Sequence, residues 1–229
     1  MKIMLFEHLK SNERRTFFLH LTYMLLEGVL AGLILLNEFV FLKSMNGSDT
    51  LMAVLFQSSV ILLIFSIFFN QALKQIRNKR RLLIFTGIFT RMPLFALLFF
   101  PTDLSQYVAG SVYHVVFLCL FFIYYFANPV IFPTINLLLK LNYSHQNFGK
   151  LYSYATSLRK SVALVSVFIF GMLYDNVPYA FVYVYPSMGV LGIISIVLLS
   201  LINYEEKDLK PVKESYFNMV KESWTNMIR

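Results

Sequence analysis

The sequence has few charged residues and almost no cysteine. Only 14% of its 229 residues are Asp, Glu, Lys or Arg, whereas 58% are apolar. Ordinary globular domains have about 25% charged and about 45–50% apolar residues. A soluble domain of this size cannot bury so much apolar surface, so the composition argues against a soluble enzyme and against a disordered protein. The single cysteine, Cys119, excludes an intramolecular disulfide and a multi-cysteine zinc site.

Signatures of catalysis are also missing. The sequence contains no His-Glu-x-x-His, no Gly-x-Ser-x-Gly and no Gly-x-x-x-x-Gly-Lys-Ser/Thr motif. With four histidines and one cysteine, a metal site is not expected either. We therefore expect neither an enzyme nor a cofactor. The net charge is +8, but the basic residues lie between apolar runs, so we expect a lipid bilayer rather than nucleic acid as their partner.

Six apolar runs are each long enough for a helix to cross the hydrocarbon core, which takes about 20 residues. They are residues 17–42, 51–73, 82–100, 107–139, 151–173 and 179–202. Long continuous runs indicate helices, because transmembrane β-strands show short alternating segments. We predict an all-α integral membrane protein with six transmembrane helices. The fourth run exceeds one crossing, and Pro129 and Pro133 predict a kink in it.

The basic residues are distributed unevenly between the gaps. Sixteen Lys or Arg residues lie in the N-terminal tail, the second and fourth gaps and the C-terminal tail, and the other three gaps hold only Lys43. Cytoplasmic loops are enriched in Lys and Arg, so both termini are predicted to be cytoplasmic, in a multi-pass protein of the cytoplasmic (inner) membrane. The predicted outer loops are residues 43–50, 101–106 and 175–178.

Three segments follow from this pattern. Residues 1–16 are charged and lack a signal-peptide cleavage site, which predicts a short cytoplasmic segment that lies as a helix at the interface. Residues 17–204 form the six-helix bundle. Residues 205–229 carry apolar residues at helical spacing, which predicts a cytoplasmic amphipathic helix.

Ionisable residues inside the spans are the strongest candidates for a functional site, because charges are costly in a bilayer and usually mark a substrate or proton path. Glu27 lies 12 residues after Arg15, and Arg91 lies 10 residues after Arg81. Both therefore reach a depth of ~15–18 Å from the cytoplasmic side, and Arg159 reaches a comparable depth. For Glu27, a buried ion pair that only joins two helices is an equally good interpretation.

Four further polar residues are weaker candidates for the path: His20, Gln57, His114 and Asn128. A lone histidine is more often a hydrogen-bonded packing residue than a proton relay, and we prefer this interpretation for His114. Every fourth residue near the start of the fifth span is small, which predicts close helix packing. These residues are Gly149, Ser153, Ser157 and Ser161.

Three local patterns accompany the six-span arrangement. The loop at 70–81 reads NQALKQIRNKRR, residues 147–160 read NFGKLYSYATSLRK, and residues 170–175 read FGMLYD. With six helices and both ends inside, they resemble the N-terminal half of a major facilitator superfamily transporter. In that family a Gly-x-x-x-Asp-Arg-x-Gly-Arg-Arg loop follows the second helix. The loop at 70–81 of this chain keeps the basic cluster at the end of the family's motif, whereas Asn70 stands in place of the leading Gly and Lys74 in place of the Asp.

The resemblance implies a fold and a function. Such transporters have two six-helix halves around a midplane cavity and alternate between inward-open and outward-open states. Helices 1, 2, 4 and 5 line the cavity, which implies Glu27, Gln57, His114 and Arg159 as lining residues. Arg91 would join them only by reaching inward to pair with Glu27. We expect a secondary active transporter, or its N-terminal half, that moves a small polar or anionic solute, with Glu27 as the residue for any proton coupling.

A cavity between two halves requires both of them. We expect residues 1–229 not to transport alone, but to need a second six-helix half from a separate chain, from a missing C-terminal half or from a copy of itself. The alternative is a non-transporting six-helix membrane scaffold or assembly protein on a degenerate transporter fold, which the altered loop at 70–81 favours. A membrane-embedded enzyme is a third hypothesis, which the missing motifs disfavour.

Overall fold

The computed structural model describes the backbone of residues 9–76 and 78–204, and the side chains of all of these except 63–72, 74 and 75. The predicted amphipathic helix at 205–229 lies outside the described residues, as do residues 1–8. Every regular element within the described part is helical, which confirms the all-α prediction.

The main helices are α1 (Ser11–Leu35), α2 (Asn37–Phe39), α3 (Asp49–Gln75), α4 (Lys79–Arg91), α5 (Val112–Tyr125), α6 (Asn128–Asn142), α7 (His145–Asn176) and α8 (Phe181–Ser200). A π-helical turn, Val40–Ser44, follows α2, and a 3-10 helix, Met92–Phe99, continues α4. Two short 3-10 turns, Leu104–Gln106 and Pro178–Ala180, lie in loops.

Five stretches of helix are long and apolar enough to cross a membrane: Ser11–Ser44, Lys79–Phe99, Val112–Asn142, His145–Asn176 and Pro178–Ser200. Each overlaps one predicted span, as expected of a multi-pass membrane protein. The second predicted span falls in α3. The described apolar part of this helix, Asp49–Leu62, is shorter than a full crossing, so this second span stays a prediction.

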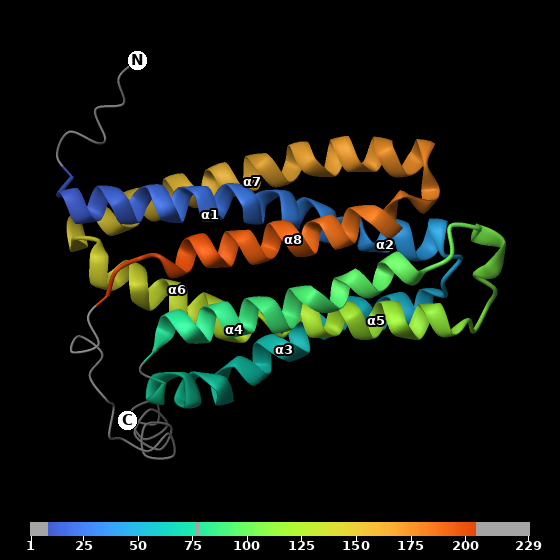
Figure 1. The fold of residues 1–229 in the computed structure, drawn as a ribbon, viewed down its shortest axis with the longest axis horizontal. Helices are drawn as coiled ribbons and strands as arrows, with labels where there is room; N and C mark the ends of the chain where they lie inside the picture. Colours follow the sequence, from blue (N-terminus) through green and yellow to red (C-terminus); the bar gives the residue numbers. More distant parts are fainter. Residues whose placement is uncertain (1–8, 77, 205–229) are drawn as a thin grey trace, which may run out of the picture.

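Successive spans run in opposite directions, with α5 and α6 following one another within a single span, and they pack into one bundle (Figure 1). α1 packs against α7 and α8, α8 packs against α4, and α3 packs against α5 and α6. The two described ends of the chain lie together. Asn12 donates a hydrogen bond to the Asn142 side chain over 3.1 Å, and Asn142 donates to the backbone oxygen of Asn203 over 2.8 Å.

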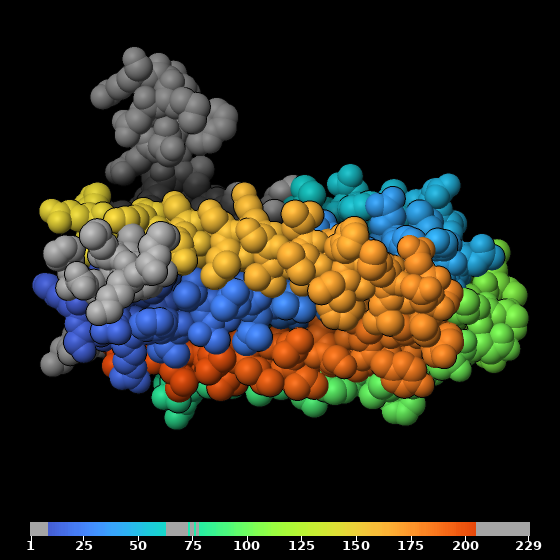
Figure 2. Space-filling model, turned by 90° about the horizontal axis from the view of Figure 1, so that it is seen from above, coloured from blue at the N-terminus to red at the C-terminus, as the bar shows by residue number. Residues whose placement is uncertain are grey.

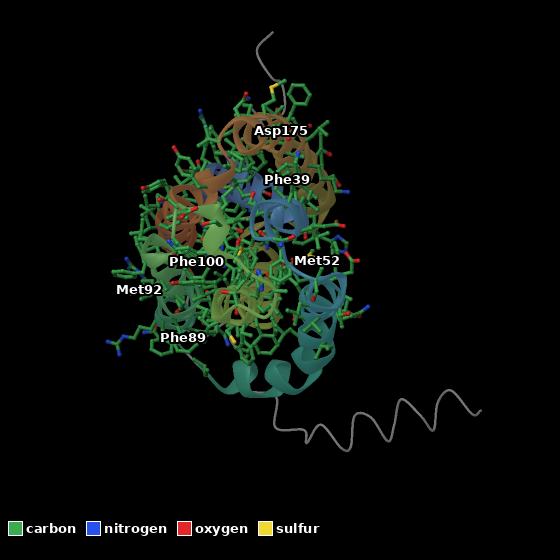
Figure 3. The ribbon with its side chains drawn as sticks, turned by 90° about the vertical axis from the view of Figure 1, so that its right-hand side faces the viewer. Phe39, Met52, Phe89, Met92, Phe100 and Asp175 are labelled. Atoms are coloured by element: carbon green, nitrogen blue, oxygen red, sulfur yellow. The ribbon has the colours of Figure 1, made fainter. Side chains whose placement is uncertain are left out.

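The other end of the bundle carries Phe39, Met52, Phe100 and Asp175, and Figure 3 looks onto it. Here Lys43 and Asp175 form an exposed ion pair over 2.9 Å, which joins the ends of the first and fifth spans.

The first span starts earlier than predicted. Residues 11–16, which the sequence assigned to a separate interfacial segment, form the first turns of α1. Glu13 on this extension is buried and accepts hydrogen bonds from the backbone N–H and the hydroxyl of Ser144, over 3.0 and 3.1 Å. It also accepts one from the side chain of Asn147, over 3.1 Å. The start of α1 is therefore tied to the start of α7.

Two spans are interrupted part-way. The fourth predicted span breaks at 126–127, and α6 then starts with Asn128 and Pro129. The kink predicted there occurs because proline lacks the N–H that would continue the helix ladder. Pro133 lies inside α6 without a second break. The third span changes from α-helix to 3-10 helix after Arg91, where Pro93 has the same effect.

Glycine on α1 allows α7 to approach closely. A Cβ atom at Gly28 would lie 2.8 Å from the backbone oxygen of Arg159, and one at Gly32 would lie 2.6 Å from that of Ala163. Small residues of this kind favour helix packing in membranes. The stripe that begins at Gly149, for which the sequence predicted close helix packing, is exposed, and a Cβ at Gly149 would meet nothing within 4 Å. Within the described chain, α7 packs closely on α1 through a different face.

We predict that Gly32→Ala lowers the stability of the bundle by about 1–3 kcal/mol, because the added methyl group collides with the α7 backbone. Gly149→Ala is the matched control. It adds the same methyl group to an open helix surface and should be neutral or slightly stabilising. Thermal unfolding in detergent micelles measures both, and equal melting temperatures for the two variants would contradict the α1–α7 contact.

Candidate functional site

A polar layer separates two apolar clusters along the bundle. On α1 the first cluster begins at Leu30 and the second ends at Met24. On α8 the first ends at Met188 and the second begins at Ile196. Glu27 lies between the clusters on α1, as does Ser195 on α8. These two polar side chains thus have apolar packing on both sides along the bundle.

Glu27 and Arg91 form a buried ion pair at this level. Arg91 Nη2 lies 3.3 Å from Glu27 Oε1, and Ser195 donates a hydrogen bond from its hydroxyl to the same oxygen over 2.7 Å. Arg91 is 3% exposed and Glu27 is 8% exposed. One carboxylate oxygen therefore joins α1, α4 and α8, and among the described residues nothing binds the other.

The Arg91 side chain is held from two further directions. Its guanidinium lies over the ring of Tyr124, 4.1 Å from the ring centre, an arrangement that stabilises a cation. Its stem packs against α8 at Gly192, where a Cβ would lie 2.6 Å from Arg91 Nε. Nε and Nη1 of Arg91 have no hydrogen-bond partner within the described chain. The pair with Glu27 therefore leaves much of the guanidinium unsatisfied.

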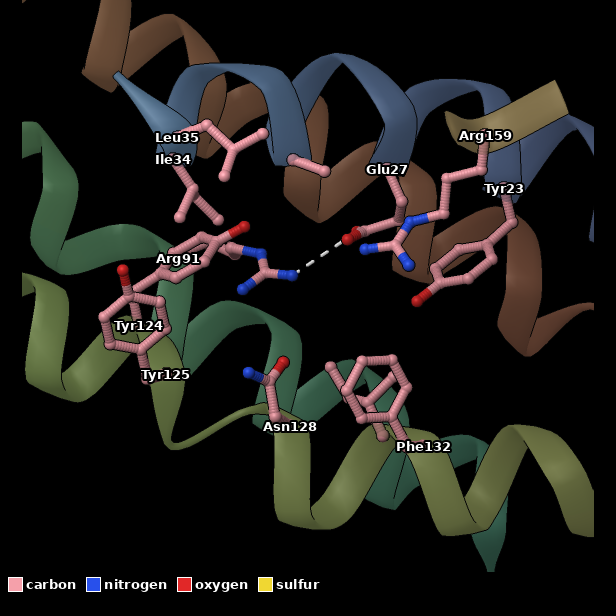
Figure 4. Close-up of a pocket in the computed structure, with 12 residues that line it drawn as sticks. Tyr23, Glu27, Ile34, Leu35, Arg91, Tyr124, Tyr125, Asn128, Phe132 and Arg159 are labelled. Carbon is pink, nitrogen blue, oxygen red and sulfur yellow. Dashed lines mark hydrogen bonds and ion pairs between the residues drawn. The ribbon is translucent and has the colours of Figure 1, made fainter. Parts of the chain in front are cut away.

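A cavity of about 280 Å³ lies beside this pair (Figure 4). Five helices line it: α1, α4, α5, α6 and α7. The lining residues are Tyr23, Glu27, Ala31, Ile34, Leu35, Arg91, Tyr124, Tyr125, Asn128, Ile131, Phe132 and Arg159. They include one carboxylate and two guanidinium groups. Because arginine stays protonated in proteins, the walls carry a net charge of +1 when Glu27 is ionised.

Arg159 is the unpaired cation of the cavity. It is half-buried, and no carboxylate of the described residues lies within ion-pair distance of it. A smaller cavity of about 50 Å³ shares Tyr23, Phe132 and Arg159 with the larger one and continues along α7 to Thr156 and Tyr152. The Thr156 hydroxyl and Arg159 Nε are buried without partners. Unsatisfied polar groups thus extend from the cavity towards the start of α7.

The structure brings together four of the seven predicted site residues: Glu27, Arg91, Asn128 and Arg159 all line the cavity. Arg91 does reach inward to Glu27, although it lies on the third span. Gln57, which the resemblance implied as a lining residue, is exposed on α3 and is not in the cavity. The lining spans are the first, third, fourth and fifth.

The two histidines among the predicted site residues, His20 and His114, lie apart from the cavity. His114 is buried, and its Nε2 is 2.6 Å from the backbone oxygen of Met45. Its ring also packs edge-on against Phe41, which is the packing environment expected for a lone histidine. His20 lies nearer the start of α1, where its Nδ1 is 3.1 Å from the Tyr143 hydroxyl. Burial, with a smaller contribution from Glu13, raises the pKa of Tyr143 above its ordinary value, so this hydroxyl stays protonated.

Sequence reasoning missed several residues of the site. Tyr124 and Ser195 contact Arg91 and Glu27 directly, and Gly192 makes room for the Arg91 stem. One signal was available on α8, where Gly189, Gly192 and Ser195 recur every third residue and so share a helix face. No group of three or more His, Cys, Asp or Glu side chains in the described residues is close enough to hold a metal ion.

Comparison with family models, with curated protein sequences and with solved structures finds no match to this chain.

Proposed function

We propose that the chain is a secondary active membrane transporter, or its N-terminal half, and that it moves a small polar or anionic solute by alternating access. The observation that carries the proposal is the buried Glu27–Arg91 pair, which lines a cavity together with the unpaired Arg159. Each of the three charges lies near the middle of its span. Charges at this depth are expensive in a bilayer and mark substrate or ion paths.

The helix interruptions support the same proposal. Arg91 is the last residue of α4 before the 3-10 helix, and Asn128 is the first residue of α6 after the break. Both line the cavity. Transporters place discontinuous helices at their substrate sites near the bilayer midplane, because irregular backbone is tolerated where it borders a water-filled space.

In the proposed topology the chain crosses the inner membrane six times, with α3 as the second crossing. Both termini lie in the cytoplasm. Two observations support it. The Lys- and Arg-rich gaps alternate with gaps that hold only Lys43, and successive spans run in opposite directions (Figure 1). This arrangement resembles the N-terminal half of a major facilitator superfamily transporter.

The proposal includes a second six-helix half as partner, supplied by another chain, by further sequence of the same protein or by a second copy. One face of α7 supports this. It runs along the surface beside α1 (Figure 2) and is exposed over most of its length. The part near the start of α7 carries the small residues Gly149, Ser153, Ser157 and Ser161, which would let another helix approach closely.

A labelling experiment tests function and topology together. In a Cys119→Ser background, Ala31→Cys places one thiol in the cavity wall. Alternating access predicts that a membrane-impermeant thiol reagent modifies it both from outside intact cells and from the cytoplasmic side of inverted vesicles. Thr102→Cys and Lys150→Cys, at exposed positions, are the controls and should react only from outside and only from inside, respectively.

The second candidate function is a membrane scaffold that transports nothing. The observation in its favour is that Ser195, Arg91 and Glu27 tie three helices together, as a purely structural brace would. A scaffold predicts that the Ala31→Cys thiol reacts from one side only or from neither side. Reaction of Lys150→Cys from outside would reject the topology.

A further inference from the structure

We propose that the cavity binds a small organic monocarboxylate, with the carboxylate at Arg159 and the apolar part of the ligand against α6. This inference deepens the proposed function, on which it rests, by naming the class of solute and the residue that recognises it. It follows from the charge of the cavity, from the unpaired donors and from the shape of the walls.

The charge balance selects a monoanion. Glu27 and Arg91 neutralise each other across 3.3 Å, and Ser195 further stabilises the carboxylate. Arg159 then remains as one uncompensated cation at the wall. An unpaired charge in a low-dielectric site is costly, and a bound monoanion removes that cost. A cation would add to the imbalance, and a dianion would reverse it.

The unpaired donors select a carboxylate. Arginine presents several N–H donors in a planar fork and no acceptor, and a carboxylate can accept two of them side by side. Arg159 makes no hydrogen bond or ion pair with the described residues, and Tyr23 lies beside it at the cavity wall (Figure 4). An amide or an alcohol of the same size would leave the charge of Arg159 uncompensated.

The walls select a small ligand with an apolar part. Besides the charged groups, the lining includes the apolar side chains of Phe132 and Ile131 on α6 and of Ala31 on α1. A volume of about 280 Å³ lies at the lower limit of ligand pockets, which span about 300–1,000 Å³. A carboxylate on a single aromatic ring or a short branched chain suits these dimensions, whereas a nucleotide does not.

Benzoate is a suitable probe, and benzamide is its neutral counterpart of nearly the same shape. We would measure the thermal unfolding of the purified full chain in detergent at constant ionic strength. A ligand that binds the folded state raises the melting temperature in a concentration-dependent, saturable way. We expect this rise with benzoate, and no rise with benzamide or with chloride at the same concentrations.

The matched variants are Arg159→Gln and Lys160→Gln, which remove neighbouring charges on α7. Lys160 is exposed and lies outside the cavity. Arg159→Gln should weaken benzoate binding about tenfold or more, as expected for the loss of a charge-assisted contact, whereas Lys160→Gln should retain it. If Arg159→Gln does not fold, Arg159→Lys replaces it and should bind more weakly than the wild type, because it lacks the planar fork.

Three results would overturn the inference. Benzamide could raise the melting temperature as much as benzoate, or Arg159→Gln could bind benzoate as tightly as the wild type. Chloride could also raise the melting temperature in a saturable way, with no further rise when benzoate is added. These results are separable from a failure of the proposed function. Benzoate binding together with one-sided labelling of Ala31→Cys would reject transport and keep the carboxylate site. Two-sided labelling without benzoate binding would keep transport and reject the carboxylate.

Discussion

Replacing Glu27 with leucine should destabilise the bundle by about 3–5 kcal/mol, whereas replacing Glu27 and Arg91 together should restore most of the lost stability. The single variant leaves the guanidinium of Arg91 buried without a counterion, since its remaining support is the ring of Tyr124. The double variant Glu27→Leu/Arg91→Met removes both charges and keeps an unbranched side chain in the groove beside Gly192. Ser195 remains satisfied, because its hydroxyl can donate its proton to the backbone oxygen of Gly192, 2.9 Å away, once Glu27 is gone.

The exposed ion pair between Lys43 and Asp175 provides the control. Lys43 and Asp175 are only 2.9 Å apart, but their side chains are 64% and 59% exposed. Solvent screens such a pair, and its loss through Lys43→Met should cost about 0–1 kcal/mol. Chemical or thermal unfolding in one detergent compares all four proteins. A double variant as unstable as the single one would show that the pair is needed for folding beyond its own charge balance.

The same double variant separates the two candidate functions. A brace between helices can be replaced by apolar packing, so a scaffold should keep its activity in assembly once stability is restored. A charged site that binds a solute cannot be replaced in this way. We therefore expect the restored double variant to show no solute uptake, because the charges that line the cavity are gone.

That Glu27 and Arg91 could meet was predictable because the helix rise is constant. Counting from the basic residues at the membrane surface placed Glu27 and Arg91 at the same level, and the two side chains pair. The break before Asn128 was predictable from Pro129 for a similarly local reason. The change to 3-10 helix after Arg91 has the same cause in Pro93, but its consequence depends on how α4 packs against α8.

Helix rotation and neighbourhood were not predictable from the sequence. The stripe that begins at Gly149 looks like a packing face, yet α7 approaches α1 at Gly28 and Gly32. Ser195 and Tyr124 join the site because α8 and α5 turn particular faces towards Arg91. Composition and spacing contain no information on these rotations. The choice of faces is decided by packing between residues that are distant in sequence.

Replacing Glu27 with glutamine should abolish the pH dependence of net solute uptake while exchange of labelled solute continues. The reason is that glutamine is neutral at every pH and keeps the shape of the carboxyl group. It can still accept a hydrogen bond from Ser195 and lie beside Arg91. If Glu27 carries a proton in each transport cycle, net uptake by the wild type should depend on pH, and this dependence should be absent from Glu27→Gln.

The groups around Glu27 determine what else could titrate. Tyr23, Tyr124, Arg91 and Arg159 face the same cavity from α1, α5, α4 and α7. Tyrosine and arginine ordinarily titrate well above neutral pH, and Glu27 is the one carboxyl group among the lining residues, so it is the candidate for proton coupling. Uptake into proteoliposomes under an imposed pH gradient measures net transport, and counterflow at equal pH measures exchange, which needs no net proton movement. Glu27→Gln protein that still responds to the gradient would assign the proton to another group. A variant that loses exchange as well as uptake would show that Glu27 is needed for solute binding, and that result would favour a positioning role for the Glu27–Arg91 pair over a proton-carrying one.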